Sequence, residues 1–526
     1  MAIRTATDEN SCPKGPPHKM KTLRIAVWCG LWLMLFALQA GSTSPPHQHA
    51  EPSVKAQALE SSSSIFAARL SMAPPGTPAT SRASQLTPHG YVEQEFFLEG
   101  KAQHYQPEPG WGKDGHWRVK PHGDAPPYLT RLLVRRPADA SRFNGVIVVE
   151  WLNTTPGFDL DGGWILTRQE IMDQGHVWVG VSTQTEGVSA LRRHSPRYEA
   201  LRLASNEGVH AVFGQTGHVI RAHWPTLLGL PTQAQAPEPR QPLQVLAMGY
   251  SQSALYLYTY INTFAPQDRV FDGFYLRGPA PLAPSVETDG DDIWAPTFRT
   301  DLDAKIMQVQ TEAEAMVSWP LSKTADTDKV RYWEISGAAH LDAHLQSEMA
   351  VITPPHAAAK PHTCWRPLND LPAYMVDHAA LHALSRWVRD DVAPPIAPRM
   401  RRNTLGFVKT DETGHAMEGL RLPDIDAPVA RYGQYSNLST SSMSIQAQYA
   451  CIAGGSKVKI SRSELEKRHA TPSQYLEAYR ASADHLLNRG FLLPRDHKEL
   501  LRRAQHAPRI QWSKLDEMAP KWADLH

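Results

Sequence analysis

Three residue types that support nucleophilic acyl chemistry follow one another along the chain. Ser251 stands in the pentapeptide Gly249-Tyr-Ser-Gln-Ser253, between an apolar run of strand length and an apolar segment of helical length. Glu312 and Glu314 come next, and His340 comes last. A serine hydroxyl is a weak nucleophile until a histidine takes its proton and a carboxylate orients that histidine. The residue types and their order therefore predict attack of Ser251 on an acyl carbonyl.

The turn around Ser251 has the layout of a nucleophile elbow. A strand, a sharp turn and a buried helix expose a serine oxygen, and the crowded turn needs small residues beside the serine. Gly249 meets that need on one side, whereas Ser253 stands where a second glycine is more usual. Such five-residue strings also occur in ordinary strand-to-helix turns. The interpretation therefore depends on the rest of the chain.

His340 is the predicted general base. It lies in the loop after a predicted strand at 330–335, and the two glutamates follow a predicted strand at 305–310. Because open α/β sheets place their sites at the carboxyl ends of the strands, these loops should meet Ser251 at one edge. The alternative is an exposed loop histidine, since the chain has 24 histidines.

Two glutamates compete for the role of the acid that orients His340. Glu312 is the first residue beyond the threonine that ends the predicted strand, and Glu314 lies a little further into the loop. We favour Glu312 and keep Glu314 open. The glutamate that is not used would be a neighbouring carboxylate without a direct role.

The negative oxygen that forms during acyl transfer needs two N–H donors. One is expected from Gln252, directly after the serine. The second is expected from Leu152 or Asn153, at the end of a predicted strand over 145–152.

We expect no cofactor and no metal. His340 and His344 are spaced like the histidines of zinc peptidase helices, but Leu341 stands where those helices carry a glutamate. We expect His344 to have no part in the chemistry.

Strands and helices alternate through the middle of the chain. Strands are predicted at 92–98, 128–135, 145–152, 176–182, 243–250, 270–277, 305–310 and 330–335, and helices at 166–174, 207–224 and 373–388. Several of the strands are near-continuous apolar runs, which is typical of strands covered on both faces. This alternation predicts an α/β fold, with a mostly parallel sheet and helices on both of its faces.

The N-terminus is typical of an exported protein. Basic residues precede an apolar run at 25–38 that ends in small residues, which predicts a secretory signal peptide over 1–40. A start at Met20 would make this signal more typical. The run is short for a membrane span, which needs about 20 residues. We therefore expect a secreted or periplasmic protein without a stable membrane anchor once the signal is cleaved. The alternative is an uncleaved N-terminal anchor.

The remaining chain divides into a linker and one domain. Residues 41–85 are rich in Ser, Pro, Ala, Gln and His without periodicity, and are predicted to be a disordered linker. Residues 86–526 are predicted to form a single domain, with 396–526 as a C-terminal extension packed on it. In this extension Thr471-Pro-Ser-Gln474 predicts the capped start of a helix.

Composition and cysteine usage agree with an exported globular protein. The formal net charge is +1 and hydrophobic residues make up 41% of the chain, so nucleic acid is not an expected partner. Cys364 and Cys451 are the cysteines that lie beyond the predicted signal. An oxidising compartment favours a disulfide between them, and the alternative is two buried thiols.

Several blocks of the sequence resemble a known family. They are Gly90-Tyr-Val-Glu93, Pro127-Tyr-Leu-Thr-Arg131, Arg136-Pro137, Val149-Glu-Trp-Leu-Asn153, Trp178-Val-Gly-Val-Ser182, Gly249 to Ala254, Val309-Gln-Thr-Glu312, His340, Leu371-Pro372 and Gly490-Phe-Leu-Leu-Pro494. The chain resembles the exported, mostly bacterial alpha/beta hydrolase domain-containing proteins, whose elbow reads G-x-S-Q-S-A. The resemblance implies an alpha/beta-hydrolase fold and a serine esterase-like mechanism. It makes Ser253 a family variant of the elbow and leaves the substrate undefined.

The sequence thus predicts a secreted or periplasmic serine hydrolase that acts on a small-molecule ester. An acyltransferase with the same residues is one alternative. A non-catalytic binding module that keeps the hydrolase shell is another.

Overall fold

A computed structural model describes residues 59–60, 68–230, 242–287, 289–318, 324–357, 362–435 and 437–505. The predicted signal peptide at 1–40 lies outside these residues, as does most of the predicted linker. None of the helices within the described ranges is both long enough and apolar enough to cross a bilayer.

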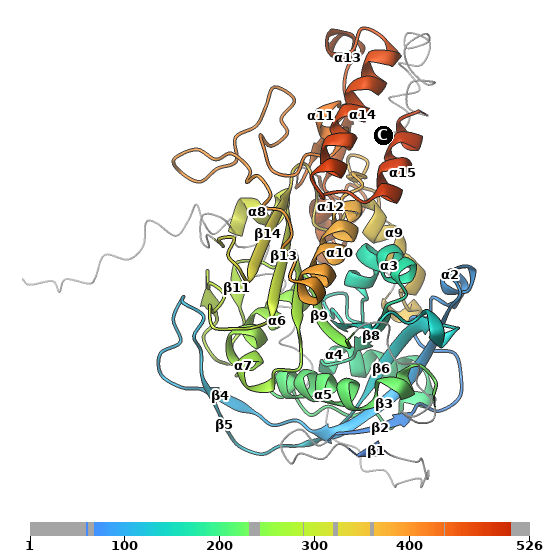
Figure 1. The fold of residues 1–526 in the computed structure, drawn as a ribbon, viewed down its shortest axis with the longest axis vertical. Helices are drawn as coiled ribbons and strands as arrows, with labels where there is room; N and C mark the ends of the chain where they lie inside the picture. The colour runs from blue at the N-terminus through green and yellow to red at the C-terminus, as the bar shows by residue number, and fades with distance from the viewer. Residues whose placement is uncertain are drawn as a thin grey trace, which may run out of the picture. The chain divides into compact units, whose positions relative to one another are not determined.

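One large sheet runs through the described residues (Figure 1). Its ten strands are, in order across the sheet, β1 (Leu59–Glu60), β2 (Arg69–Met72), β3 (Tyr91–Lys101), β6 (Pro127–Pro137), β8 (Val177–Val181), β7 (Val146–Trp151), β9 (Gln244–Tyr250), β10 (Gly273–Arg277), β13 (Lys305–Thr311) and β14 (Val330–Ile335). The strands from β8 to β14 pair in parallel, and the others pair antiparallel at one side. The predicted mostly parallel sheet is confirmed.

Helices cover both faces of this sheet. On one face α3 (Gly162–Gln174) and α10 (Tyr374–Asp390) share a hydrophobic core with β7, β9 and β13. On the other face α5 (Val209–Leu227) and α6 (Gln252–Thr263) share a core with the opposite side chains of the same sheet. All residues of β7, β8 and β9 are buried, which explains their near-continuous apolar sequences.

The register of the central strands brings three loops to one edge. Trp151 of β7 pairs with Val181 of β8 on one side and with Gly249 of β9 on the other. Neighbouring strands lie about 4.8 Å apart, so the residues that follow these three are close neighbours. The carboxyl ends of β7 and β8 therefore lie to one side of the end of β9 that leads into Ser251.

Helix α3 begins four residues earlier than the sequence predicts. The prediction started it at Leu166, whereas the observed helix begins with Gly162 and Gly163, although glycines are poor helix formers. In the structure the Glu150 carboxylate accepts hydrogen bonds from the backbone N–H groups of Gly163 and Trp164, both at 2.7 Å. This cap from the neighbouring strand satisfies N–H groups at the helix start and stabilises the first turn.

Short elements complete the core domain. They are α2 (Ala83–Leu86), α4 (Thr185–His194), α7 (Ala265–Asp268), α8 (Glu312–Ser318), α9 (Ala343–Ile352), and the strand pairs β4 (Tyr105–Pro107) with β5 (Val119–Pro121) and β11 (Leu282–Ala283) with β12 (Ile293–Trp294).

The C-terminal extension, described as far as residue 505, packs on α10 and β14. Its elements are α11 (Pro423–Asp426), β15 (Ala430–Gly433), α12 (Ile445–Gly454), β16 (Ser456–Lys459), α13 (Arg462–Arg468), α14 (Pro472–Asn488) and α15 (Pro494–Ala504). The Thr471 hydroxyl accepts a hydrogen bond from the Gln474 N–H at 3.2 Å, as its sequence predicts. Phe491, between α14 and α15, lies edge-on to Trp333 of β14 at a centroid distance of 5.0 Å.

The predicted disordered linker, 41–85, is ordered over 68–85, the longer of its two described parts. There β2 adds a strand beside β3, and the Arg82 side chain is buried with 1% exposure. Arg82 donates to both carboxylate oxygens of Asp161, at 2.8 and 2.9 Å, and to Glu348 at 3.0 Å. The prediction of disorder is therefore wrong for 68–85. This segment is ordered because it pairs with a strand of the sheet and with buried carboxylates. Amino-acid composition alone does not reveal such partners.

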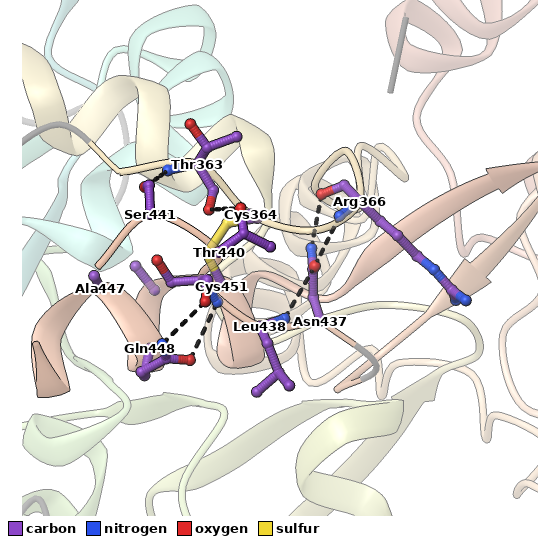
Figure 2. Close-up of a disulfide and its surroundings, with 12 residues drawn as sticks. Thr363, Cys364, Arg366, Asn437, Leu438, Thr440, Ser441, Ala447, Gln448 and Cys451 are labelled. Carbon is purple, nitrogen blue, oxygen red and sulfur yellow. Dashed lines mark hydrogen bonds between the residues drawn. A yellow bond between two sulfur atoms is a disulfide. The ribbon is translucent and has the colours of Figure 1, made fainter. Parts of the chain in front are cut away.

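Cys364 and Cys451 form the disulfide that the sequence predicts (Figure 2). Their Cα atoms lie 5.5 Å apart, and the bond joins positions 87 residues apart in sequence. It links the segment before α10 to helix α12 of the extension.

Candidate active site

Ser251 occupies a sharp turn between β9 and α6. Its φ of +56° and ψ of −118° are uncommon for a residue with a side chain. The Ser251 N–H donates to the Arg277 carbonyl at 2.8 Å, which ties the turn to β10. A Cβ atom on Gly249 would lie within 2.9 Å of the backbone of Ser253 and Ala254. Glycine is therefore required at this place in the elbow.

Ser253 completes the same turn from inside. Its hydroxyl accepts from the Tyr250 N–H and donates to the Tyr250 carbonyl, both at 2.9 Å. Buried backbone groups need such partners. The serine thus gives the Tyr250 N–H an acceptor and shares the Tyr250 carbonyl with the Asn153 side chain, which a glycine could not do.

His340 lies between Ser251 and a carboxylate. Its Nε2 is 2.9 Å from the Ser251 Oγ, and its Nδ1 contacts Glu314. The Tyr250 ring stacks on the imidazole at a centroid distance of 5.3 Å, and the Tyr250 hydroxyl donates to the His340 carbonyl at 2.8 Å. Both ring nitrogens of His340 thus have a partner, and Tyr250 covers one face of the ring.

Glu314 is held in its ionised form. Burial alone would raise its pKa, but the contact with His340 and the nearby charge of Arg277 lower this pKa to about 2. The Thr311 N–H also donates to its second oxygen, at 2.7 Å. An ionised Glu314 accepts from Nδ1–H of His340, and this leaves Nε2 to accept the proton of Ser251.

Glu312, which we favoured from the sequence, makes no hydrogen bond to His340. Its carboxylate accepts from the Gly337 N–H at 2.7 Å and from the Gln434 side chain at 2.8 Å. The reason is that α8 begins at Glu312, where the sequence predicts a loop. At about 100° per helical residue, side chains two positions apart point to nearly opposite sides.

Neither predicted second oxyanion donor is available. The Leu152 N–H donates to the Val181 carbonyl at 3.2 Å, and the Asn153 N–H donates to the Leu160 carbonyl at 3.0 Å. A backbone N–H already paired in this way does not face the reacting serine. Leu152 and Asn153 are therefore corrected as candidates.

Thr154 is the better candidate, and the sequence reasoning missed it. Its backbone N–H donates to the side-chain oxygen of Gln252 at 3.2 Å, so it faces the elbow. The Asn153 side chain donates to the Tyr250 carbonyl at 2.9 Å and anchors this loop to the elbow. Gln252 is the first residue of α6, and a first helical N–H has no partner within its own helix. The N–H groups of Gln252 and Thr154 are therefore the two candidate donors for a negative substrate oxygen at Ser251.

His344 lies apart from this arrangement and stacks on Tyr374 at 4.2 Å. Within the described part of the chain, one group has three side chains close enough to share a metal ion, namely His362, Cys364 and Cys451. The two sulfurs are bonded to each other, and a metal requires the thiolate form.

Residues 59–502 match the family model described as an alpha/beta hydrolase domain. The chain belongs to this alpha/beta hydrolase family. The fold predicted from the sequence is thereby confirmed, as is the resemblance to this family.

Solved structures share parts of this alpha/beta hydrolase at low identity. Esterase Est22 is 14% identical over 38% of this chain and 49% of its own, with a TM-score of 0.22. A prolyl endopeptidase is 10% identical over 50% of this chain and 38% of its own, with a TM-score of 0.26. Oligopeptidase B from Leishmania major is 9% identical over 49% of this chain and 40% of its own, with a TM-score of 0.26. This chain thus spans about half of these relatives or less. A search of curated protein sequences found no match.

Proposed function

We propose that this alpha/beta hydrolase is a serine hydrolase that cleaves carboxylic esters of small molecules. The observation that carries the proposal is the continuous contact from the Ser251 hydroxyl through the His340 imidazole to Glu314. The three residues come from the ends of β9, β14 and β13, and all are buried. Burial keeps competing water away and strengthens their mutual electrostatics.

In the proposed acylation step, the Ser251 oxygen attacks the carbonyl carbon of the ester. His340 Nε2 takes the hydroxyl proton as the new C–O bond forms, and Glu314 stabilises the resulting imidazolium. The carbonyl oxygen becomes negative and accepts from the backbone N–H groups of Gln252 and Thr154. The side-chain oxygen of Gln252 now lies against the Thr154 N–H, so the substrate oxygen would have to replace it there.

His340 then acts as an acid towards the leaving alcohol and again as a base towards water. The bond to the alcohol breaks, and His340 gives its proton to the leaving alkoxide. A water then loses a proton to His340 and attacks the acyl carbon. The acid product leaves when Ser251 regains the proton. These steps need no cofactor.

We also propose that the protein is exported to the periplasm or beyond the cell. The basic and apolar pattern of residues 19–42 supports this location. The Cys364–Cys451 disulfide supports it independently, because such bonds persist mainly in oxidising compartments.

A fluorophosphonate probe tests the proposal without knowledge of the natural substrate. The folded protein should be labelled at Ser251, as read by peptide mass mapping. A Ser251→Ala variant and heat-unfolded parent protein should remain unlabelled. Failure of the folded parent protein to react would overturn the proposed function and favour a binding protein.

A substrate panel then tests the reaction class. We expect turnover of p-nitrophenyl esters and much slower turnover of the matching anilides. Adding an alcohol or amine acceptor separates the acyltransferase alternative, because a transferase would form the new ester or amide in preference to the free acid.

A further inference from the structure

The loop that carries His340 is held from both sides by segments distant in sequence. On one side the Leu341 N–H donates to the Ala453 carbonyl at the end of α12, at 2.8 Å. On the other side the Asn369 side chain donates to the Gly337 carbonyl at 2.7 Å. These two segments lie outside the strands that carry Ser251 and Glu314.

Asn369 makes contacts before and after the histidine. Its side-chain nitrogen bonds to the Gly337 carbonyl, three residues before His340, and its own carbonyl accepts from the Ala343 N–H, three residues after, at 2.8 Å. Its side-chain oxygen accepts from the Leu371 N–H at 3.0 Å. Asn369 is fully buried, with 0% exposure. One side chain and its backbone therefore span the whole loop.

The disulfide holds Asn369 against the extension. The Asn369 N–H donates to the Gly454 carbonyl at 3.1 Å. Cys364 lies five residues before Asn369, and Cys451 lies three residues before Gly454. The covalent bond and this hydrogen bond thus join the same two stretches of chain.

Asn437 ties the same two stretches together without contacting the histidine loop. Its side-chain nitrogen donates to the Arg366 carbonyl at 2.9 Å (Figure 2). The same nitrogen donates to the Gly455 carbonyl at 2.8 Å. Like Asn369 it is buried, with 2% exposure. It differs in making no hydrogen bond to residues 336–343 of the described chain, and so offers a matched control.

We propose that Asn369 is a positioning residue for His340, and that the Cys364–Cys451 disulfide keeps Asn369 in place. This inference rests on the proposed function. The His340 Nε2 must stay within hydrogen-bond reach of Ser251, now 2.9 Å, for proton transfer to occur. A misplacement of about 1 Å in such a site costs on the order of 100-fold in rate. The extension is therefore a structural part of the active site.

The test compares Asn369→Asp with Asn437→Asp in the full chain. Aspartate keeps the size of asparagine but places an acceptor oxygen against a carbonyl oxygen in both variants. The measurements are kcat and KM for p-nitrophenyl acetate, the rate of fluorophosphonate labelling of Ser251, and the melting temperature. Both variants should lose similar stability. N369D should also lose about 10- to 100-fold in kcat and in labelling rate with little change in KM, whereas N437D should stay within about threefold of the parent protein.

A variant without the disulfide, C364S/C451S, provides a second measurement if N369D does not fold. At temperatures where this variant is folded, its kcat should fall about tenfold, and reduction of the parent protein by a phosphine should have the same effect. A folded N369D with parent kcat, equal losses in N369D and N437D, or full kcat in the folded C364S/C451S variant would overturn the inference. Failure of the proposed function gives a different result, since the parent protein itself would then be neither labelled nor active.

Discussion

Glu314 contacts the Nδ1 of His340, while Glu312, two residues earlier, bonds to the backbone of the loop that carries His340. The two glutamates should therefore respond differently to the same change. Glu314→Gln should lower kcat by about 10³- to 10⁴-fold, because a carboxamide favours the wrong tautomer of the imidazole. Glu312→Gln should keep most of the activity, since the Gln434 side chain can turn over to pair with it.

Steady-state kinetics with p-nitrophenyl acetate measure this difference. Equal kcat losses in the two variants would contradict the assignment of Glu314 as the orienting acid.

The buried Glu312 predicts a pH-dependent stability. Burial raises its pKa from 4.5 to about 7, despite the opposing hydrogen bond from Gly337. The folded state therefore holds a proton that the unfolded state releases above pH 4.5, and stability declines as the pH rises towards 7. Glu312→Gln has no such proton. Between pH 4.5 and 7.5 the parent protein should lose roughly 2–3 kcal/mol of unfolding free energy relative to this variant. Urea titrations at several pH values test this, and parallel pH curves would refute it.

We expect the Asn153 side chain to affect kcat, because it holds the loop that carries the Thr154 N–H. Its side chain anchors the Thr154 loop to the Tyr250 carbonyl at 2.9 Å. Asn153→Ala should release this loop and misplace the proposed Thr154 donor. Loss of one oxyanion donor costs about 10²- to 10³-fold in kcat, and a misplaced donor should cost part of that. We expect kcat to fall at least about tenfold with KM little changed. An unchanged kcat would exclude Thr154 as the donor.

Ser253 predicts a stability effect at the elbow. Ser253→Ala would leave the buried Tyr250 N–H without the hydroxyl that now accepts from it, while the Tyr250 carbonyl would keep the Asn153 side chain as its donor. An unsatisfied buried polar group costs about 1–3 kcal/mol. Ser253→Gly should be at least as destabilising, because it also adds backbone freedom at the start of α6. Denaturant unfolding measures both variants, and parent stability in Ser253→Ala would contradict this account.

We expect residues 68–85 to contribute to stability through the buried side chain of Arg82. Arg82→Ala would remove one of the two arginines that pair with the buried Asp161. Because Arg135 still pairs with this carboxylate, the cost should be that of the lost charged hydrogen bonds, about 1.5–3 kcal/mol. Arg118, which is exposed and pairs with Glu108 at 3.5 Å, is the matched control. Arg118→Ala should cost at most about 1 kcal/mol. Equal unfolding midpoints for the two variants would indicate that residues 68–85 contribute little.

Local sequence patterns were sufficient to predict the strands, the elbow and the order of the candidate catalytic residues. The strands around Ser251 are covered on both faces, so their apolar runs were visible without any partner. The elbow needs a glycine and small residues for steric reasons within five positions, which is again a local requirement. The order of serine, acid and histidine along the chain could be read directly, and so could the two cysteines left beyond the predicted signal.

Partners across the fold decided the rest. Whether Glu312 or Glu314 faces His340 depends on where α8 begins, and a shift of two residues on a helix reverses the direction of a side chain. Whether an N–H is free to bind an oxyanion depends on which neighbouring carbonyl it already meets, as for Leu152 and Asn153. The bonds of Asn369 to the histidine loop and to α12 have no local signal, since these partners lie about 30 residues before it and 85 after it in sequence. Hydrogen-bond pairing between distant segments is a property of the folded chain, and only the tertiary structure determines it.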